Sequence, residues 1–510
     1  MLDYGSPEPS LQRVLRRIPR LSARTWLLGL VAAASIIWCW NNRDIWVVQH
    51  TFPRAFSSLA ENVSPDRRQI IVRDSPGDVE STGRLSVVDI DTAEIFRTFG
   101  ISGDCRREMI ISPDGTRLLT LGGWQQLTDS TNGVSTTRTL GGPVPRPHLW
   151  DLTTGNLIAD LDPLPITSQA CFSPDGYRIV TLENERATLY DGATGQRVAV
   201  LEKLENGMGV GHAAFFSPDS KLVVISMGGP TPIRIHSTID GHLVATQANP
   251  IGFWASGDMP ATFSPDGRSL AFSTGSTLQQ IDALTGQPLV APVRLSGSCW
   301  RLWYGLDGRR LYSLSNSSTT SGSAMTLSAI DSGTGRPVAT AKTIFDLSPR
   351  VAFSPDGREL ILSHWLGSID VFDSAKLAGL GSVPGRASGY SGAPFSPDGS
   401  RAVAIVSSAP ATIDVLDTRT WRPASSIHDP WSQFSDAVFV RDSAHLLTAT
   451  GSGTIRLWYR RRPEAMWGLI ALPAFWVALC TALIWLISLR RDIRLWNMPI
   501  ARPRDVADAK

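Results

Sequence analysis

The fold of this chain is indicated by a stretch at residues 263–289, which reads FSPDGRSLAFSTGSTLQQIDALTGQPL. In its first turn, residues 264–267, proline presets φ for the second position, aspartate can hydrogen-bond nearby backbone, and glycine accepts a left-handed conformation. The apolar runs after this turn have about four to six residues, which suits strands and is too short for helices. A second turn follows at Thr285 and Gly286. The stretch therefore predicts three or four antiparallel strands.

This unit is repeated along the chain. Exact or degenerate copies of its first turn begin at Val63, Ile111, Phe172, Phe216, Phe263, Gly305, Phe353, Phe395 and Val440. Intervals of roughly 40 to 60 residues are the period expected of propeller blades. Nine copies suggest as many as nine blades, whereas typical propellers have roughly four to eight. We therefore predict eight or nine blades. If one copy falls short of a full blade, we expect it to be the one at Gly305 or at Val440.

On these repeats the chain resembles the WD40-like β-propellers, and its SPDG turns are similar to those of periplasmic propellers. Trp150 and Asp151, after an apolar strand, match the signature dipeptide of the WD40 family, although it occurs once in this form. In later copies, as at Asp191, the aspartate stays and the tryptophan is replaced. The Gly-His pair of the family has one counterpart, at 211–212. The resemblance covers roughly residues 60 to 460. It implies an all-β fold, a single β-propeller of about eight or nine four-stranded blades.

One further strand is predicted before the first repeat. In propellers of this family an N-terminal strand usually joins the last blade as its outermost member. Here residues 45–52, IWVVQHTF, form a strand candidate, whereas the last repeat ends at Tyr459 without a fourth strand. We therefore expect residues 45–52 to complete the last blade and close the ring, which protects the sheet edges.

Two uncharged segments flank the repeats, and one transmembrane helix is predicted at each end. The segment at 465–489 is long enough to span a membrane with tilt. The segment at 25–41 follows five arginines. We interpret it as an uncleaved anchor, because Trp38 and Trp40 stand where a signal peptidase needs small residues; a cleaved signal peptide is the alternative.

Arginine counts predict the orientation in the membrane. Both ends of the chain carry arginines and therefore prefer the cytoplasm, which places the propeller outside the cytoplasm, at a cell (inner) membrane. Residues 460–462 are three arginines that run against this bias, and a cytoplasmic propeller follows if the first segment does not insert. The predicted regions are a cytoplasmic Arg-rich segment at 1–24, a transmembrane helix at 25–41, the WD40-like propeller at 42–462, a transmembrane helix at 465–489 and a cytoplasmic tail at 490–510.

No residue pattern indicates an enzyme. The eight histidines have no HxH or HExxH spacing, and no GxSxG elbow or P-loop occurs. The aspartates of the turns and strand ends are interpreted as structural, because catalysis uses one or two special residues and not a copy in each blade. We predict no catalytic, cofactor-binding or metal residues and no cofactor. Cys171 is interpreted as a small core residue, with a disulfide to Cys105 possible outside the cytoplasm.

Composition and loops limit the functions that we expect for this chain. The 510 residues carry a net charge of +2, without the concentrated basic face that nucleic acid requires. Polar insertions at 123–147 and 315–324 are either binding loops or tolerated extensions. We expect a membrane-tethered, non-catalytic protein-protein interaction platform that binds an unidentified protein or peptide on the propeller face, contacts the lipid bilayer through two helices, and binds no nucleic acid. The alternative is a ligand-binding or enzymatic extracytoplasmic propeller with a site in the central channel.

Overall fold

The computed structural model describes most of the repeat region. The described residues are 45–52, 63–74, 83–101, 104–123, 126–131, 134–139, 146–162, 169–182, 186–203, 213–226, 232–247, 260–319, 322–344, 350–364, 368–384, 386–387, 394–406, 411–429, 433–461, 480 and 483–487. Trp46–Tyr459 form one compact unit. Residues Met1–Ile45 and Arg460–Lys510 belong to a second unit.

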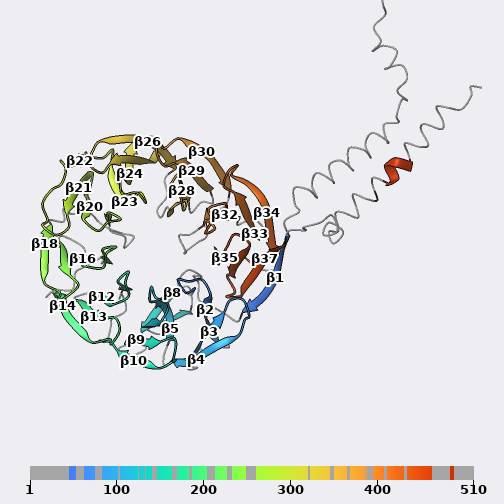
Figure 1. Ribbon diagram of the computed structural model, residues 1–510, viewed down its shortest axis with the longest axis horizontal. Helices are drawn as coiled ribbons and strands as arrows, with labels where there is room; N and C mark the ends of the chain where they lie inside the picture. The colour runs from blue at the N-terminus through green and yellow to red at the C-terminus, as the bar shows by residue number, and fades with distance from the viewer. Residues whose placement is uncertain are drawn as a thin grey trace, which may run out of the picture. The chain divides into compact units, whose positions relative to one another are not determined.

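Within the first unit, nine antiparallel sheets follow one another around a ring (Figure 1). Blade 1 has β2 (Gln69–Asp74), β3 (Gly83–Asp89) and β4 (Ile95–Ile101), and Val63 bridges to Ile70 at its inner edge. Blades 2 to 5 consist of β5 (Asp104–Ile111), β6 (Arg117–Gly123), β9 (His148–Asp151) and β10 (Leu157–Asp160); β11 (Gln169–Phe172), β12 (Arg178–Leu182), β13 (Arg186–Asp191) and β14 (Arg197–Lys203); β15 (Ala213–Phe216), β16 (Leu222–Ser226), β17 (Ile233–Ser237) and β18 (Leu243–Gln247); and β19 (Ala261–Phe263), β20 (Ser269–Thr274), β21 (Thr277–Asp282) and β22 (Val293–Arg294).

Blades 6 to 9 complete the ring. They consist of β23 (Ser298–Tyr304), β24 (Arg310–Thr319), β25 (Gly322–Asp331) and β26 (Pro337–Ile344); β27 (Arg350–Phe353), β28 (Glu359–His364), β29 (Ser368–Asp373) and β30 (Gly379–Pro384); β31 (Arg386–Ala387), β32 (Arg401–Val406), β33 (Ala411–Asp417) and β34 (Arg422–Asp429); and β35 (Phe434–Phe439), β36 (His445–Thr450), β37 (Ile455–Arg461) and β1 (Ile45–Phe52). The degenerate turns at Gly305 and Val440 therefore both belong to four-stranded blades. The all-β propeller has nine blades, of which blade 1 has three strands and the Val63 bridge.

Ring closure occurs as the sequence predicts. β1 lies beside β37 as the outermost strand of blade 9, so one sheet contains both ends of the repeat region. The indole Nε1 of Trp46 on β1 donates a hydrogen bond of 2.9 Å to Ser425 Oγ in blade 8. Phe52, at the other end of β1, packs with Ile70 of blade 1 and Val438 of blade 9. The added strand is therefore tied to both neighbours of the sheet that it completes.

The hydrophobic core is divided among the interfaces between blades. The described residues form nine clusters of buried side chains, and each cluster joins two consecutive blades, including blade 9 with blade 1. The apolar residues come mainly from the second and third strands of each blade, which are covered on both faces by neighbouring blades. A blade cannot bury both faces alone, so its stability depends on the neighbours on either side.

The SPDG turn has one hydrogen-bonding pattern, illustrated by blade 8. Ser396 Oγ donates to Asp398 Oδ1 at 2.6 Å and accepts from the Arg401 amide at 2.9 Å. Gly399 has φ +68°, and a Cβ added to it would lie 3.3 Å from Cδ of Pro355 in the turn of the preceding blade. The motif therefore forms the turn, and its glycine also allows close approach to the turn of the preceding blade.

Both predicted insertions form hairpins in the described residues. β7 (Gln126–Thr131) and β8 (Val134–Thr139) make a separate two-stranded sheet between the second and third strands of blade 2. The second insertion extends the β24–β25 hairpin of blade 6 as far as the pair Thr319 and Gly322. Cys171 packs in a core, as the sequence predicts. It is a free thiol that points toward the Ala214 carbonyl of blade 4, on the side away from blade 2, so the disulfide to Cys105 that the sequence left open does not form.

The predicted membrane segments fall largely on residues that are not described. The span at 25–41 lies entirely outside the described residues, and of the span at 465–489 only Cys480 and residues 483–487 are described, as helix. Among the described residues, no helix has the length and apolar character that a membrane span requires.

We predict that Phe52→Ala destabilises the ring by about 3–5 kcal/mol, because it removes a buried aromatic from the interface that joins the last blade to the first. Val47→Ala, on the exposed side of the same strand, should cost less than about 0.5 kcal/mol. The measurement is thermal and denaturant unfolding of both variants in the full chain. Equal stability of the two variants would contradict the role given to β1.

Candidate functional site

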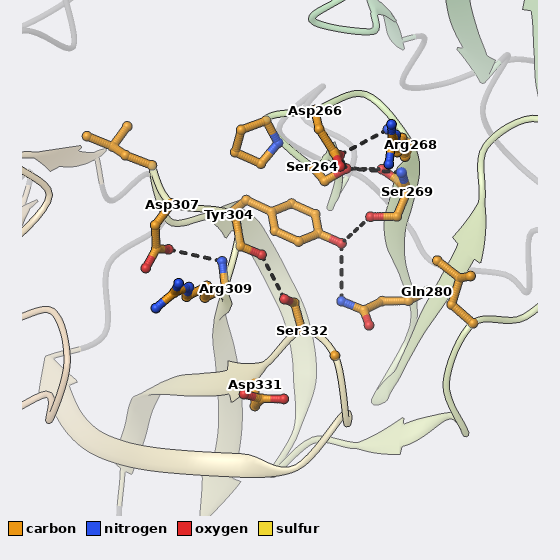
Figure 2. A pocket seen from close by; sticks show the side chains of 15 residues that line it. Ser264, Asp266, Arg268, Ser269, Gln280, Tyr304, Asp307, Arg309, Asp331 and Ser332 are labelled. Atoms are coloured by element: carbon orange, nitrogen blue, oxygen red, sulfur yellow. Dashed lines mark hydrogen bonds between the residues drawn. The ribbon is translucent and has the colours of Figure 1, made fainter.

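A pocket of about 570 Å³ lies between blades 5 and 6 (Figure 2). One wall is the SPDG turn of blade 5, and the opposite wall is the degenerate GLDG turn of blade 6 together with the hairpin at Asp331. Gln280 on β21 and Tyr304 at the end of β23 are the buried members of the lining along with Ser264, whereas Leu289 and Leu306 are exposed. The pocket thus combines a buried polar pair with exposed apolar side chains.

The polar pair and Ser269 form a hydrogen-bonded group of three side chains from two blades. Gln280 Nε2 donates to Tyr304 Oη at 3.1 Å, and the same hydroxyl shares a 3.0 Å hydrogen bond with Ser269 Oγ. Figure 2 shows the Tyr304 hydroxyl pointing toward Gln280 and Ser269. The other amide atom, Gln280 Oε1, is buried and has no hydrogen-bond partner among the described residues. A buried acceptor without a donor is costly; Thr181 Oγ1 and Ser313 Oγ are also buried without a partner in the described residues, but neither lines this pocket.

The other eight blades provide an internal comparison for Gln280. It lies two residues before Asp282, the residue that pairs with Ser269 at the start of the second strand, and the equivalent position in every other blade has a buried apolar residue. These residues are Val87, Leu149, Leu189, Ile235, Ala329, Val371, Val415 and Leu457. Blade 5 is therefore the one blade with a polar side chain at this buried position.

Tyr304 is the matching exception in blade 6. It precedes the first turn, where the other blades have Val63, Ile111, Phe172, Phe216, Phe263, Phe353, Phe395 and Phe439. At each of the eight other interfaces this residue packs in the same cluster as the third-strand residue of the preceding blade. At the remaining interface Gln280 and Tyr304 replace an apolar contact by a hydrogen bond, so the two polar residues depend on each other.

The pocket lies beside an interruption of the outer strand of blade 5. β22 has two residues, Val293–Arg294, and follows an irregular segment that begins after Pro288 and contains Pro292. Proline has no amide hydrogen to donate to a strand ladder, so Pro292 weakens the pairing of this segment with β21. Leu289 in this segment is exposed and forms part of the lining.

The lining carries more negative than positive charge. It includes Asp266, Asp307 and Asp331 against Arg268 and Arg309. A hydrogen bond from Ser264 lowers the pKa of Asp266, and a hydrogen bond from Thr334 lowers the pKa of Asp331, so both are ionised at neutral pH. Burial raises the pKa of Tyr304, which therefore stays protonated there.

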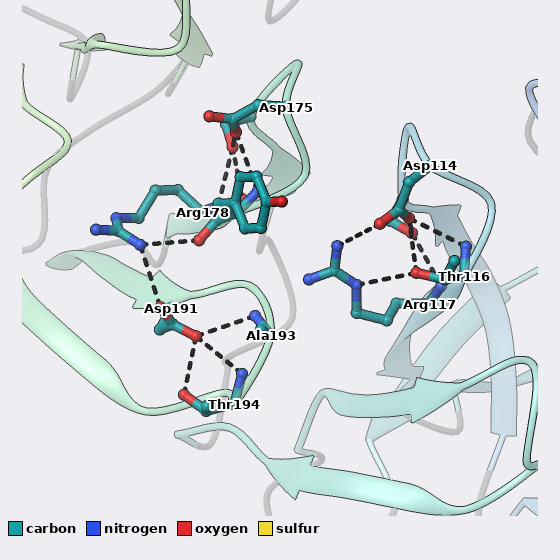
Figure 3. Close-up of polar contacts among 11 residues, drawn as sticks. Asp114, Thr116, Arg117, Asp175, Arg178, Asp191, Ala193 and Thr194 are labelled. Atoms are coloured by element: carbon teal, nitrogen blue, oxygen red, sulfur yellow. Dashed lines mark hydrogen bonds and ion pairs between the residues drawn. The ribbon is translucent and has the colours of Figure 1, made fainter.

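The repeated aspartates serve turns, as the sequence predicts (Figure 3). Asp191 Oδ1 accepts from the amides of Ala193 and Thr194 and from the Thr194 hydroxyl, at 2.9 to 3.0 Å. Its other oxygen contacts Arg178 Nη1 at 3.1 Å. Asp114 accepts from the Thr116 amide at 3.0 Å in the turn of blade 2. These carboxylates are occupied by local hydrogen bonds, which agrees with their interpretation as structural residues.

Two buried histidines take part in contacts between blades. His236 Nε2 lies 3.0 Å from Glu202 Oε1 of the preceding blade, and His364 Nε2 lies 3.1 Å from Thr343 Oγ1 of the preceding blade. Burial lowers the pKa of His236. In the segments that the structure describes, no group of three or more His, Cys, Asp or Glu side chains is placed to hold a metal ion.

Gln280 and Tyr304 were not predicted as site residues from the sequence. Each has a residue type that differs from those at the same position in the other copies of the repeat. An alignment of the nine copies shows both differences. The alignment does not show that the two departures meet, because they are 24 residues apart on different blades.

Comparison with known proteins bears on the fold. The sequence matches none of the known protein-family profiles and none of the curated proteins. Among solved structures, a crystal structure of the eukaryotic initiation factor aligns over 74% of this chain and 90% of that chain, with 18% identity and a TM-score of 0.50. This similarity agrees with the β-propeller fold that the strand pairing shows.

Two further structures align less closely with this propeller. The C-terminal WD40 domain of Sif2 covers 62% of this chain and 89% of its own, with 14% identity and a TM-score of 0.44. Dihydro-heme d1 dehydrogenase NirN in complex with DHE covers 75% and 77%, with 18% identity and a TM-score of 0.46. At these identities the similarity concerns fold, and the function of this propeller is argued from its own residues.

We predict that the double variant Gln280→Leu with Tyr304→Phe is as stable as the parent or more stable by about 1 kcal/mol, because it restores an apolar pair and removes the unpartnered acceptor. Tyr304→Phe alone should lose about 1–3 kcal/mol, since it deprives Gln280 of its one hydrogen bond. Gln279→Leu, on the next residue of the strand, is the control. Chemical unfolding measures all three, and a double variant less stable than the single one would contradict the pairing.

Proposed function

We propose that this protein is a membrane-tethered, non-catalytic interaction platform whose propeller binds a partner protein through the pocket between blades 5 and 6. The observation that carries the proposal is the departure of Gln280 and Tyr304 from eight apolar counterparts, in the lining of an open pocket. A buried acceptor without a partner lowers stability, so its presence at a surface opening is accounted for if a bound partner supplies the donor.

The surroundings of the pocket support a protein partner. Exposed Leu289 and Leu306 lie beside ionised aspartates, and a mixed apolar and polar surface of this kind is typical of protein contacts. Leu306 stands where most copies of the repeat have proline in the turn. The rigid ring holds these side chains in a fixed arrangement, which reduces the entropy lost on binding.

Tethering to the membrane is the second part of the proposal. The apolar segments at 25–41 and 465–489 and the arginines beside them support two spans, with both ends of the chain in the cytoplasm and the propeller outside it. The partner is then a protein of the cell envelope or of an equivalent lumen.

Cysteine labelling on intact cells tests the tethering. Single cysteines are introduced at Ser130, on the inserted hairpin β7–β8, and at Ala507, in the tail, in a cysteine-free background. We expect a membrane-impermeant thiol reagent to label Ser130→Cys and to label Ala507→Cys only after the cells are permeabilised. Protection of both positions on intact cells would place the propeller in the cytoplasm and refute this orientation.

Photo-crosslinking tests the interaction. A photo-reactive phenylalanine analogue replaces Leu306 at the pocket or, as the matched control, Leu243 on the outer strand of blade 4; the two leucines are 56% and 50% exposed. We expect irradiated native cells to give one discrete protein adduct from position 306 that is absent from position 243 and absent when Gln280→Leu and Tyr304→Phe are added. The same adducts from both positions, or none from position 306, would refute a partner at this pocket.

A further inference from the structure

We propose that the pocket between blades 5 and 6 receives a guanidinium group, supplied by an arginine side chain of the partner. The source of the arginine rests on the proposed function. The preference of the pocket for guanidinium follows from its own acceptors and charges, and can be tested without the partner.

The first requirement is a donor for Gln280 Oε1. This oxygen is buried in the lining and lacks a hydrogen-bond partner among the described residues, while the amide nitrogen is held by Tyr304 Oη at 3.1 Å. A ligand that donates an N–H to this oxygen would satisfy it. An anionic or purely apolar ligand would leave it unsatisfied.

The second requirement is positive charge. Three aspartates and two arginines in the lining leave an excess of one negative charge, since 2 − 3 = −1. In the turns, Asp266 and Asp331 each use Oδ1 to accept local hydrogen bonds. Their ionised carboxylates therefore favour a monovalent cation at the opening of the pocket.

Guanidinium fits these two requirements better than ammonium does. It carries five N–H donors in a flat fork, so one group can donate to a neutral amide oxygen and to a carboxylate at once. The ammonium of lysine is a compact, strongly hydrated charge, and burying it beside an amide oxygen costs more. The aliphatic part of an arginine side chain would lie against apolar surface such as that of Leu289 and Leu306, which are both exposed at the pocket.

The test is binding of small blocked amino acids to the full chain in detergent. The probes are N-acetyl-arginine methylamide and the corresponding derivatives of lysine and citrulline, followed by saturation-transfer NMR. Lysine keeps the charge without the fork, and citrulline keeps a planar donor group without the charge. We expect the arginine probe to bind at least about fivefold more tightly than either of the others, because only it provides both charge and fork.

Variants of the pocket test whether the arginine probe binds there. Gln280→Leu with Tyr304→Phe, which restores the apolar pair of the other blades, should weaken binding of the arginine probe by about tenfold or more, as expected when a charge-assisted hydrogen bond is lost. Gln279→Leu, one residue away on β21 and outside the lining, should leave it unchanged. Circular dichroism and unfolding confirm that the variants are folded.

The outcomes separate this inference from the proposed function. Equal binding of the arginine and lysine probes, or arginine binding that survives in the double variant, would overturn the guanidinium site even if Leu306 crosslinks to a protein. Selective arginine binding that the double variant abolishes would establish the site even if no protein adduct forms, and the proposed function alone would then fail.

Discussion

Closure of the ring by β1 is the constraint on which the rest of the propeller depends. Each blade buries two faces against its neighbours, so an open row of blades would leave two apolar faces in water. β1 prevents this by completing blade 9, whose side chains then pack on blade 8 through Trp46 and on blade 1 through Phe52. Because the strand comes from before the first repeat, the two ends of the repeat region are held in a single sheet. Separation of the ends therefore requires the loss of strand pairing as well as of core contacts.

Once the ring is closed, the repeated turns determine how closely the blades approach. The buried serine hydroxyl and the aspartate fix each turn internally, as Ser396 and Asp398 do in blade 8. The glycine then packs on the preceding turn, as Gly399 does on Pro355. The same three residue types therefore account for local conformation and for contact between blades. This double use explains why the motif is repeated so closely in a sequence whose other positions vary.

The sequence was sufficient for the fold because the repeat contains most of the information that determines it. Turn residues, short apolar runs and their spacing predicted the blades, and the missing fourth strand after Tyr459 predicted the role of β1. The number of blades stayed open because the turns at Gly305 and Val440 lack the serine, and only strand pairing shows that their blades are complete. The Cys105–Cys171 disulfide stayed open because the direction of Cys171 depends on which neighbouring blade its strand faces. The pocket was missed for a similar reason, since Gln280 and Tyr304 meet across an interface, beside an interruption of the outer strand of blade 5.

The location of the pocket has a physical explanation in the same repeat. Eight interfaces are sealed by an aromatic or aliphatic residue against an apolar third-strand residue, and such contacts add to stability without any ligand. The ninth gives up part of this stabilisation and retains a buried amide oxygen without a partner. In a nearly symmetric ring the loss is confined to one interface, because each blade contacts only its two neighbours. A repeat protein can therefore carry a polar pocket at one interface while the remaining eight maintain the fold, and the residues that break the repeat mark where that pocket lies.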